Sequence, residues 1–148
     1  MARCFPFFSQ LLRQRGCWCS WRRLVSISQD LAVFFENKNN FSKAKFTAFG
    51  MTKRSGRSAD NDPQLRSLID AHSDSVCLVA KTWDFHVDLA LGISLEENVE
   101  AIKDSVLSVK ASGKEALIDC EHFFDGYKSN SEFSFKCIES ALESGAEW

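Results

Sequence analysis

The sequence predicts an α/β fold in which parallel strands alternate with helices. Residues 76–80 and 116–118 are short, continuously apolar runs, which are typical of strands buried on both faces. Helical patterns of ten to twenty residues lie between and after these runs. Strands separated by helices of this length pair in parallel through right-handed crossovers. Periodicity alone leaves open whether the sheet closes into a barrel or stays open and doubly wound.

Size and composition indicate one globular domain. The 148 residues are 45% hydrophobic and 26% charged, and the net charge of −2 gives no reason to expect nucleic acid or an acidic membrane surface as a partner. No apolar run reaches the length of a membrane span. Cys77, Cys120 and Cys137 lie in apolar surroundings and indicate core residues in a reducing compartment. Cys17 and Cys19 do not have zinc-site spacing.

The first thirty residues differ in character from the rest. Residues 1–29 contain five arginines and no acidic residue, and the first acid is Asp30. Such a start is compatible with an organelle transit peptide, with a disordered basic tail, or with a segment that is not a natural part of the reading frame. We favour the last interpretation and expect a basic leader over residues 1–30, followed by one domain over 31–148.

The elements of that domain begin with residues 31–36, which resemble the end of a helix, and a polar loop at 37–42. Residues 46–49 predict a strand, and a basic loop with Lys53, Arg54 and Arg57 follows it. Asp62 and Pro63 then provide a helix cap and a first helical residue. This helix ends near residue 72, and its buried stripe consists of Leu65, Leu68 and Ile69.

The strand at 76–80 is followed by a predicted loop at 81–87 and then by a capped helix. Ser94 and Glu97 form a capping box, in which each side chain satisfies an exposed N–H group. The helix has one apolar face, which consists of Leu95, Val99, Ile102, Val106 and Val109. Gly113 is a natural C-terminal stop.

The strand at 116–118 leads into a cluster of polar side chains. Asp119, Glu121, His122 and Asp125 occur within seven residues, and Asp125 with Gly126 predicts a turn. Side chains alternate along a strand, so Asp119 and Glu121 point to the same side. Two carboxylates at the end of a buried strand require either paired donors or a site that faces them.

A last helix is predicted over residues 131–144. Its expected buried side chains are Phe135, Ile138, Ala141 and Leu142. Glu147 and Trp148 resemble the start of another strand.

Three segments of the chain resemble a known family. They are Phe-Thr-Ala-Phe-Gly-Met-Thr-Lys-Arg at 46–54, Lys-Thr-Trp-Asp-Phe-His at 81–86, and Glu-His-Phe-Phe-Asp-Gly-Tyr-Lys at 121–128. In this order and spacing they are similar to the bacterial-type citramalate synthases, which are relatives of the 2-isopropylmalate and homocitrate synthases and of hydroxymethylglutaryl-CoA lyase. The resemblance covers about residues 31–148. It implies a partial TIM (β/α)8 barrel, with about strands 3–5 and their helices.

The resemblance also implies an activity. The family condenses acetyl-CoA with pyruvate to citramalate, in isoleucine biosynthesis, and uses a divalent metal (Mg, Mn or Zn). The metal ligands of the family are an Asp in a first-strand Arg-Asp-Gly motif and a later His-x-His pair, and both motifs are absent here. We therefore expect a segment that is inactive alone, from an acyltransferase that forms homodimers. The alternatives are a 2-isopropylmalate synthase segment, from leucine biosynthesis, and a non-catalytic remnant that binds a partner through open strand edges.

The resemblance assigns site residues at the strand ends. Glu121 is the expected catalytic residue, by positioning substrate or transferring a proton, and the structural alternative is an acid paired with a neighbouring Lys or Arg. His86 and Asp119 are expected to bind substrate, although His86 has a turn-capping alternative. His122 is expected to point outward, and the basic loop at 50–58 to be solvated rather than to bind an anion. No metal ligand is assigned, and the expected location is the cytoplasm, or an organelle if residues 1–30 are a transit peptide.

Overall fold

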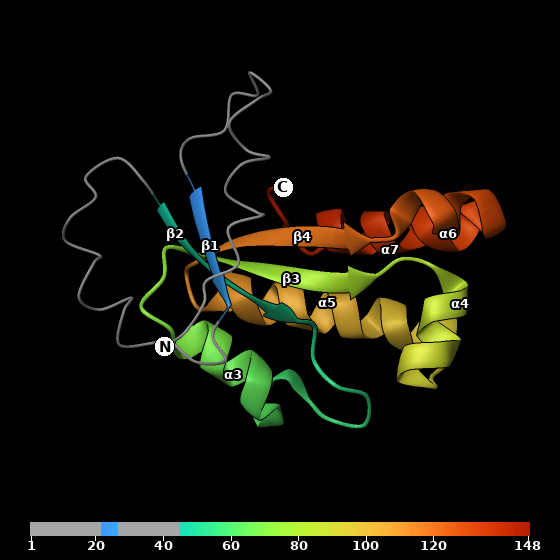
Figure 1. Cartoon of the computed structure of the whole chain (residues 1–148). Helices are drawn as coiled ribbons and strands as arrows, with labels where there is room; N and C mark the ends of the chain where they lie inside the picture. The colour runs from blue at the N-terminus through green and yellow to red at the C-terminus, as the bar shows by residue number, and fades with distance from the viewer. Residues whose placement is uncertain (1–21, 27–44) are drawn as a thin grey trace, which may run out of the picture.

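The fold is a parallel sheet with its helices on one side. The computed structural model describes residues 22–26 and 45–148 (Figure 1). Four parallel strands lie side by side in chain order: β1 (Arg22–Ser26), β2 (Lys45–Met51), β3 (Ser75–Lys81) and β4 (Glu115–Glu121). The α/β class and the parallel strands are therefore confirmed. The predicted helix end at 31–36 and loop at 37–42 lie outside the described residues.

Strand β1 lies within the segment that was expected to be a separate leader. Arg22–Ser26 pairs in parallel with the first five residues of β2. Five residues of the expected leader are therefore part of the sheet, and the boundary at residue 30 stays a prediction. The physical reason for this pairing is that an edge strand such as β2 presents unpaired N–H and C=O groups, and an extended neighbouring segment satisfies them.

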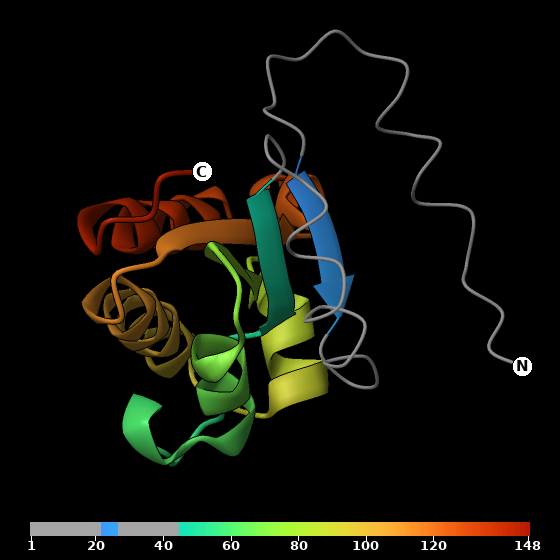
Figure 2. The same cartoon turned by 90° about the vertical axis from the view of Figure 1, so that its left-hand side faces the viewer.

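Three longer helices cover one face of the sheet. They are α3 (Pro63–Asp70), α5 (Leu95–Ala111) and α7 (Ser131–Glu143), and Figure 2 shows them on the same side of the curved sheet. The core joins Ala48, Val76, Leu78, Ala80 and Ala116 of the strands to the buried side chains of these helices. Sequential strand order with helices on one face is consistent with part of a TIM barrel, because doubly wound sheets have helices on both faces.

The predicted caps of α3 and α5 are largely confirmed. Asp62 is fully buried, and its carboxylate accepts N–H bonds from Gln64 and Leu65. Ser94 accepts the N–H bond of Glu97, but the Glu97 carboxylate accepts a bond from Ser55 instead of completing the capping box. The apolar face of α5 lies in the core as predicted: Ile102, Val106 and Val109 are fully buried, and Leu95 and Val99 are half-buried.

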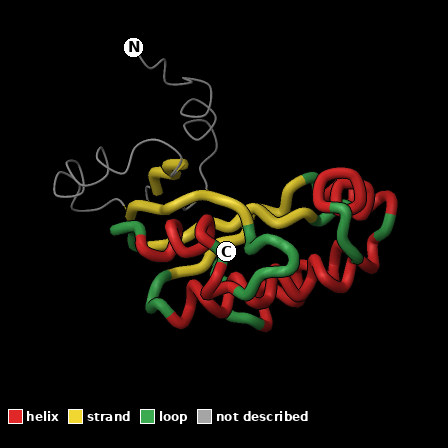
Figure 3. The backbone as a smooth tube through the Cα atoms, turned by 90° about the horizontal axis from the view of Figure 1, so that it is seen from below, coloured by secondary structure: helices red, strands yellow, loops and turns green. Residues whose placement is uncertain are grey.

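Two segments that were predicted as loop or turn are helical. After β3 come α4 (Asp84–His86) and the π-helical turn η3 (Val87–Leu91), which Gly92 closes with a φ of 62°. After β4 comes α6 (Phe123–Ser129), so that Asp125 and Gly126 are part of a helix rather than a turn. Both helices lie beyond the tips of the strands, at the C-terminal end of the sheet (Figures 1 and 3).

The buried face of α7 agrees only in part with the predicted one, because Ala141 is buried and Ile138 is half-buried as expected, but Phe135 and Leu142 are not. Phe133, Ser134, Cys137 and Ala141 are buried, whereas Phe135 is 48% and Leu142 is 59% exposed. Phe135 contacts the rings of Phe123 and Tyr127 on α6 instead of the core. Because α6 was not predicted from the sequence, its competing aromatic surface was not expected either.

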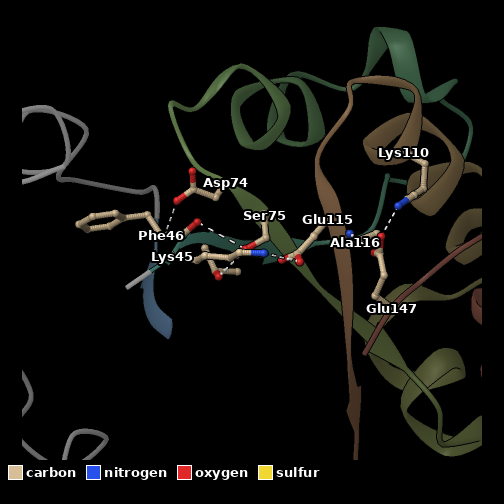
Figure 4. A network of polar contacts seen from close by, with 9 residues as sticks. Lys45, Phe46, Asp74, Ser75, Lys110, Glu115, Ala116 and Glu147 are labelled. Carbon is tan, nitrogen blue, oxygen red and sulfur yellow. Dashed lines mark hydrogen bonds and ion pairs between the residues drawn. The ribbon is translucent and has the colours of Figure 1, made fainter. Parts of the chain in front are cut away.

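Polar contacts hold the N-terminal ends of the strands together (Figure 4). Lys45 of β2 pairs with Glu115 of β4 at 2.6 Å, and the buried hydroxyls of Thr47 and Ser75 are 2.6 Å apart. Glu147 binds Lys110 and accepts the N–H bond of Ala116. In parallel α/β folds this end of the sheet serves stability, and the opposite end carries the site.

The last two residues extend beside β4. Glu147 N donates to Ala116 O at 2.9 Å, and Ile118 N donates to Trp148 O at 2.8 Å. The bonded residues advance in the same direction along β4 and along residues 147–148, as expected for the start of a parallel strand. No further strand is formed within the described residues.

Candidate functional site at the C-terminal ends of the strands

An ion pair joins the last residues of β3 and β4. Lys81 and Glu121 are register partners, and Lys81 Nζ binds Glu121 Oε2. The side chain of Lys81 is 15% exposed and that of Glu121 is 35% exposed. This contact is the pairing with a neighbouring Lys that was the structural alternative for Glu121. Among residues 45–148 no hydrogen-bond donor reaches the other carboxylate oxygen, Oε1.

Alternation places this pair on the sheet face opposite the helices. Ala80 and Ala116 belong to the helix-packed core, so Lys81 and Glu121 point the other way. In a closed barrel this face lines the interior. In a closed barrel, a carboxylate at this position would lie at the end of the strands where TIM-barrel sites are built.

Three side chains hydrogen-bond to the backbone of the site, one from the segment after β3 and two from helices α5 and α7. Thr82 is fully buried, and its Oγ1 donates to Glu121 O at 2.8 Å. Asn98 of α5 donates to Lys81 O at 2.9 Å, and Ser134 of α7 donates to Thr82 O at 2.8 Å. The carbonyl groups of Lys81 and Thr82 therefore have hydrogen-bond partners although β3 ends here. These bonds fix the backbone from which the side chains of Lys81 and Glu121 project.

His86 and His122 come together beside Trp83. The ring centroids of the two histidines are 4.4 Å apart in a T-shaped contact, and the ring of His86 is 4.6 Å from that of Trp83. His122 has a φ of 55°, a left-handed conformation that lies at the junction of β4 and α6. Its Nδ1 is 3.3 Å from Asp125 Oδ2.

The position of His122 was not expected from the sequence. The side chain is exposed, as predicted, but it contacts His86 instead of standing apart. Asp125 and Gly126 indicated a turn, so helix α6 was not predicted. His122 is the N-cap residue of this helix. The sequence signal for this contact was the place of His122, directly after a strand and before two aromatic residues, Phe123 and Phe124.

Asp119 lies on the same face as Glu121, two residues earlier, and its side chain is exposed. Its charge acts on Cys77: burial, followed by the charges of Asp119 and Cys120, raises the pKa of the Cys77 thiol to about 12. Burial likewise raises the pKa of Cys137 to about 12. Cys77 and Cys137 are therefore buried, unreactive core residues, as predicted, whereas Cys120 is half-buried.

The basic loop is only partly solvated. The Lys53 side chain is 11% exposed, and its Nζ donates to Arg57 O and lies 3.4 Å from Asp104 of α5. Arg54 N donates to Asp62 Oδ2 at 2.7 Å. The expectation of a solvated loop is therefore wrong for Lys53. Its backbone N–H donates to Ser105 of α5, which holds this part of the loop against the helix. Arg54 and Arg57 are exposed, as expected. The loop borders an open hollow of about 340 Å³ beside η3.

The described residues do not form a metal site. Within residues 22–26 and 45–148, no group of three or more His, Cys, Asp and Glu side chains is placed to hold a metal ion. His86, His122 and Asp125 cluster but do not meet that requirement. In the same residues no helix is both long enough and apolar enough to cross a membrane.

Sequence comparisons identify relatives of the chain. No protein-family model matches it. It is 46% identical over 118 residues to an (R)-citramalate synthase of Aquifex aeolicus, a match that covers 78% of this chain and 22% of the relative. It is 45% identical over 120 residues to that of Geobacter sulfurreducens, covering 80% and 23%. It is 43% identical over 108 residues to that of Streptomyces coelicolor, covering 73% and 20%. The chain is thus a relative of the (R)-citramalate synthases that spans about a fifth of the length of the curated relatives it matches.

Proposed function

We propose that this chain is a segment of an acyltransferase that condenses acetyl-CoA with pyruvate to citramalate. The observation that carries the proposal is the position of Glu121, at the C-terminal end of a parallel strand and on the face opposite the helices, in a chain 43–46% identical to three (R)-citramalate synthases. The alternative of a 2-isopropylmalate synthase is not favoured, because the matched relatives carry the citramalate synthase name. In this proposal β2, β3 and β4 are barrel strands 3–5, and the enzyme is cytoplasmic.

Glu121 positions the keto acid or transfers a proton. Lys81 Nζ binds Oε2, which fixes the orientation of the carboxylate. Oε1, which no donor among residues 45–148 reaches, is then the atom that accepts a proton or a substrate hydrogen bond. His86 and Asp119 provide further polar groups near the same end of the sheet and are proposed to contact substrate.

The proposed chemistry is incomplete within this segment. Family resemblance implies a divalent metal, but the side chains of the described residues do not fit one. The residues of this segment contribute the orientation of the substrate and the basic oxygen of Glu121.

A chimera tests the proposal directly. Residues 45–148 would replace the matching segment of the Aquifex aeolicus relative, and citramalate formation from acetyl-CoA and pyruvate would be followed. A functional segment yields a folded chimera that forms citramalate at a rate near that of the parent. A folded chimera without citramalate formation contradicts the proposal.

The non-catalytic alternative rests on the same absence of metal ligands among the described residues. It predicts that a folded chimera stays inactive when the parent's own metal ligands are present. The chimera therefore separates the two functions.

A further inference from the structure

We propose that Thr82 is a positioning residue for Glu121: its buried hydroxyl group holds the backbone carbonyl of Glu121 and thereby sets the direction of the carboxylate. The inference rests on the proposed function, in which that carboxylate positions the keto acid or transfers a proton. Thr82 itself contacts no reacting atom in this account and acts only through Glu121.

The last backbone hydrogen bond between the ends of β3 and β4 is long. Thr82 N donates to Glu121 O at 3.4 Å, whereas backbone hydrogen bonds are commonly about 2.9–3.0 Å long. The Thr82 hydroxyl donates to the same oxygen at 2.8 Å and is therefore the shorter of the two contacts. Because Thr82 is fully buried, its hydroxyl has no water as an alternative partner. The hydroxyl is thus the main group that holds the end of β4 to the segment after β3.

The backbone turns directly after Glu121. His122 has a φ of 55°, the one positive φ of a non-glycine residue within the described part of the chain. Such a conformation costs about 1 kcal/mol or more and persists only where neighbouring contacts hold it. On the α6 side, Asp125 N and Gly126 N donate to His122 O at 3.1 and 3.0 Å. On the strand side, the Thr82 hydroxyl holds Glu121 O, and without it only the long N–H bond would remain.

Thr82 is held in turn by two helices. Ser134 of α7 is fully buried, and its hydroxyl donates to Thr82 O at 2.8 Å. Gly126 of α6 lies so close to the same oxygen that the structure leaves no room for a Cβ atom there. Thr82 therefore cannot shift to follow a displaced Glu121. A group fixed in this way can control the geometry of a neighbouring side chain that performs chemistry.

The ion pair with Lys81 does not replace this contact. Asn98 holds the backbone carbonyl of Lys81 at 2.9 Å, but the Lys81 ammonium group lies at the end of a flexible four-carbon chain. The ammonium group can therefore follow the carboxylate if the end of β4 moves. Loss of the Thr82 hydroxyl should leave Glu121 paired with Lys81 but change the direction in which its free oxygen points.

Nuclear magnetic resonance on the full 148-residue chain tests the positioning. Deuterium relaxation of the Glu121 Cγ methylene measures the order of this side chain on the picosecond-to-nanosecond timescale. Thr82→Val keeps nearly the same shape without the hydroxyl and should lower that order. Thr82→Ser keeps the hydroxyl and should preserve it. Thr47→Val is the matched control, because it removes another fully buried hydroxyl, 2.6 Å from Ser75 Oγ at the N-terminal end of the strands, and should leave Glu121 unchanged.

Turnover of the chimera with the Aquifex aeolicus relative tests the consequence for the reaction. A misplacement of about 1 Å at a reacting group costs up to about a hundredfold, so Thr82→Val should lower kcat by roughly ten- to a hundredfold, with KM nearly unchanged. Thr82→Ser should retain kcat, and Thr47→Val should lower only Tm. When Glu121→Gln is already present, Thr82→Val should lower kcat no further, because residues that act through one group are not additive.

Three results would overturn the inference. The first is a folded Thr82→Val chain in which Glu121 is as ordered as in the unsubstituted chain. The second is an active chimera in which Thr82→Val has the same kcat as Thr47→Val. The third is a chimera in which the effects of Thr82→Val and Glu121→Gln multiply.

Two other outcomes are separated from these. An unsubstituted chimera that folds without activity contradicts the proposed function, and the relaxation measurement on the full chain still decides whether Thr82 positions Glu121. If Thr82→Val does not fold, Ser134→Ala removes the hydroxyl that holds Thr82 O and should lower the order of Glu121 in the same direction. An unchanged order in Ser134→Ala would then contradict the inference.

Discussion

Replacing Gly126 with alanine should unfold the C-terminal end of the sheet more easily, although alanine is the better helix former. Gly126 is buried in α6, where the helix lies against the segment that follows β3. A Cβ atom at this position would lie 2.3 Å from Thr82 O, 2.7 Å from Ser134 Oγ and 2.9 Å from Trp83 Cα. Two of these neighbours are backbone atoms, and the carbonyl of Thr82 is itself bonded to Ser134. They cannot rotate away.

The magnitude follows from two opposing effects. Alanine in place of glycine favours a helix by about 1 kcal/mol. Relieving the contact with Thr82 O requires α6 to move by about 1 Å, and overpacking of this kind costs about 1–3 kcal/mol or more. Because two of the three close neighbours are backbone atoms, the cost lies in the upper part of that range, at about 2–3 kcal/mol. We therefore expect a net loss of roughly 1–2 kcal/mol in the free energy of unfolding, which lowers Tm by about 3–6 °C for a chain of this size.

Calorimetry or thermal circular dichroism measures this loss, and Gly50→Ala is the control. A Cβ at Gly50 meets only the Leu68 side chain, at 2.8–3.3 Å, and that side chain can change rotamer. Its effect should be smaller than that of Gly126→Ala. In addition, the ring signals of His86 and His122 in NMR spectra should shift in Gly126→Ala alone, because α6 orients His122. A Gly126→Ala protein as stable as the parent would refute the packing argument.

Two further predictions concern titration and reactivity. Burial alone would raise the pKa of Asp62, but N–H bonds from Arg54, Leu65 and Gln64 and the charge of Arg54 lower it overall. Its stabilising contribution is therefore full above the unfolded pKa of about 3.9 and is lost as the pH falls through the folded value; urea titrations at several pH values should show this loss, and Asp62→Asn should flatten it. Cys77 and Cys137, whose pKa values are raised to about 12, should resist iodoacetamide at pH 8 in the folded chain; mass spectrometry showing rapid alkylation of either residue before unfolding would contradict the burial that the structure gives them.

The elements with local signals were predictable from the sequence. The strands at 76–80 and 116–118 needed only their apolar runs. Burial on both faces holds for β3, whereas in β4 only Ala116 is buried and Leu117 and Ile118 are half-buried. Asp62 and Ser94 marked two helix starts, since their side chains bind N–H groups two or three residues away, within the same local segment. The location of Glu121 at the end of β4 followed from the apolar run before it, and its face followed from alternation; its role as a site residue stays a prediction.

The remaining features depend on contacts that are distant in the sequence. Glycine in α6 indicated a turn, but Gly126 is required by the close approach of Thr82, which lies 44 residues earlier. Phe135 was assigned to the core by helical period alone, yet it lies against α6. Glu97 was expected to cap its own helix, but Ser55 in a distant loop competes for the carboxylate. Local patterns contain no information on such partners.

We propose that Glu121 performs chemistry rather than only pairing with Lys81. The most direct test is Glu121→Gln in the chimera with the Aquifex aeolicus relative, with turnover and Tm measured on the same preparation. Gln keeps the shape and removes the charge and the basic oxygen. We predict a loss in turnover of about 10²–10⁴-fold, the range of general acid–base groups, with Tm close to that of the unsubstituted chimera. A lowered Tm with unchanged turnover per folded molecule would show a structural ion pair and contradict the claim.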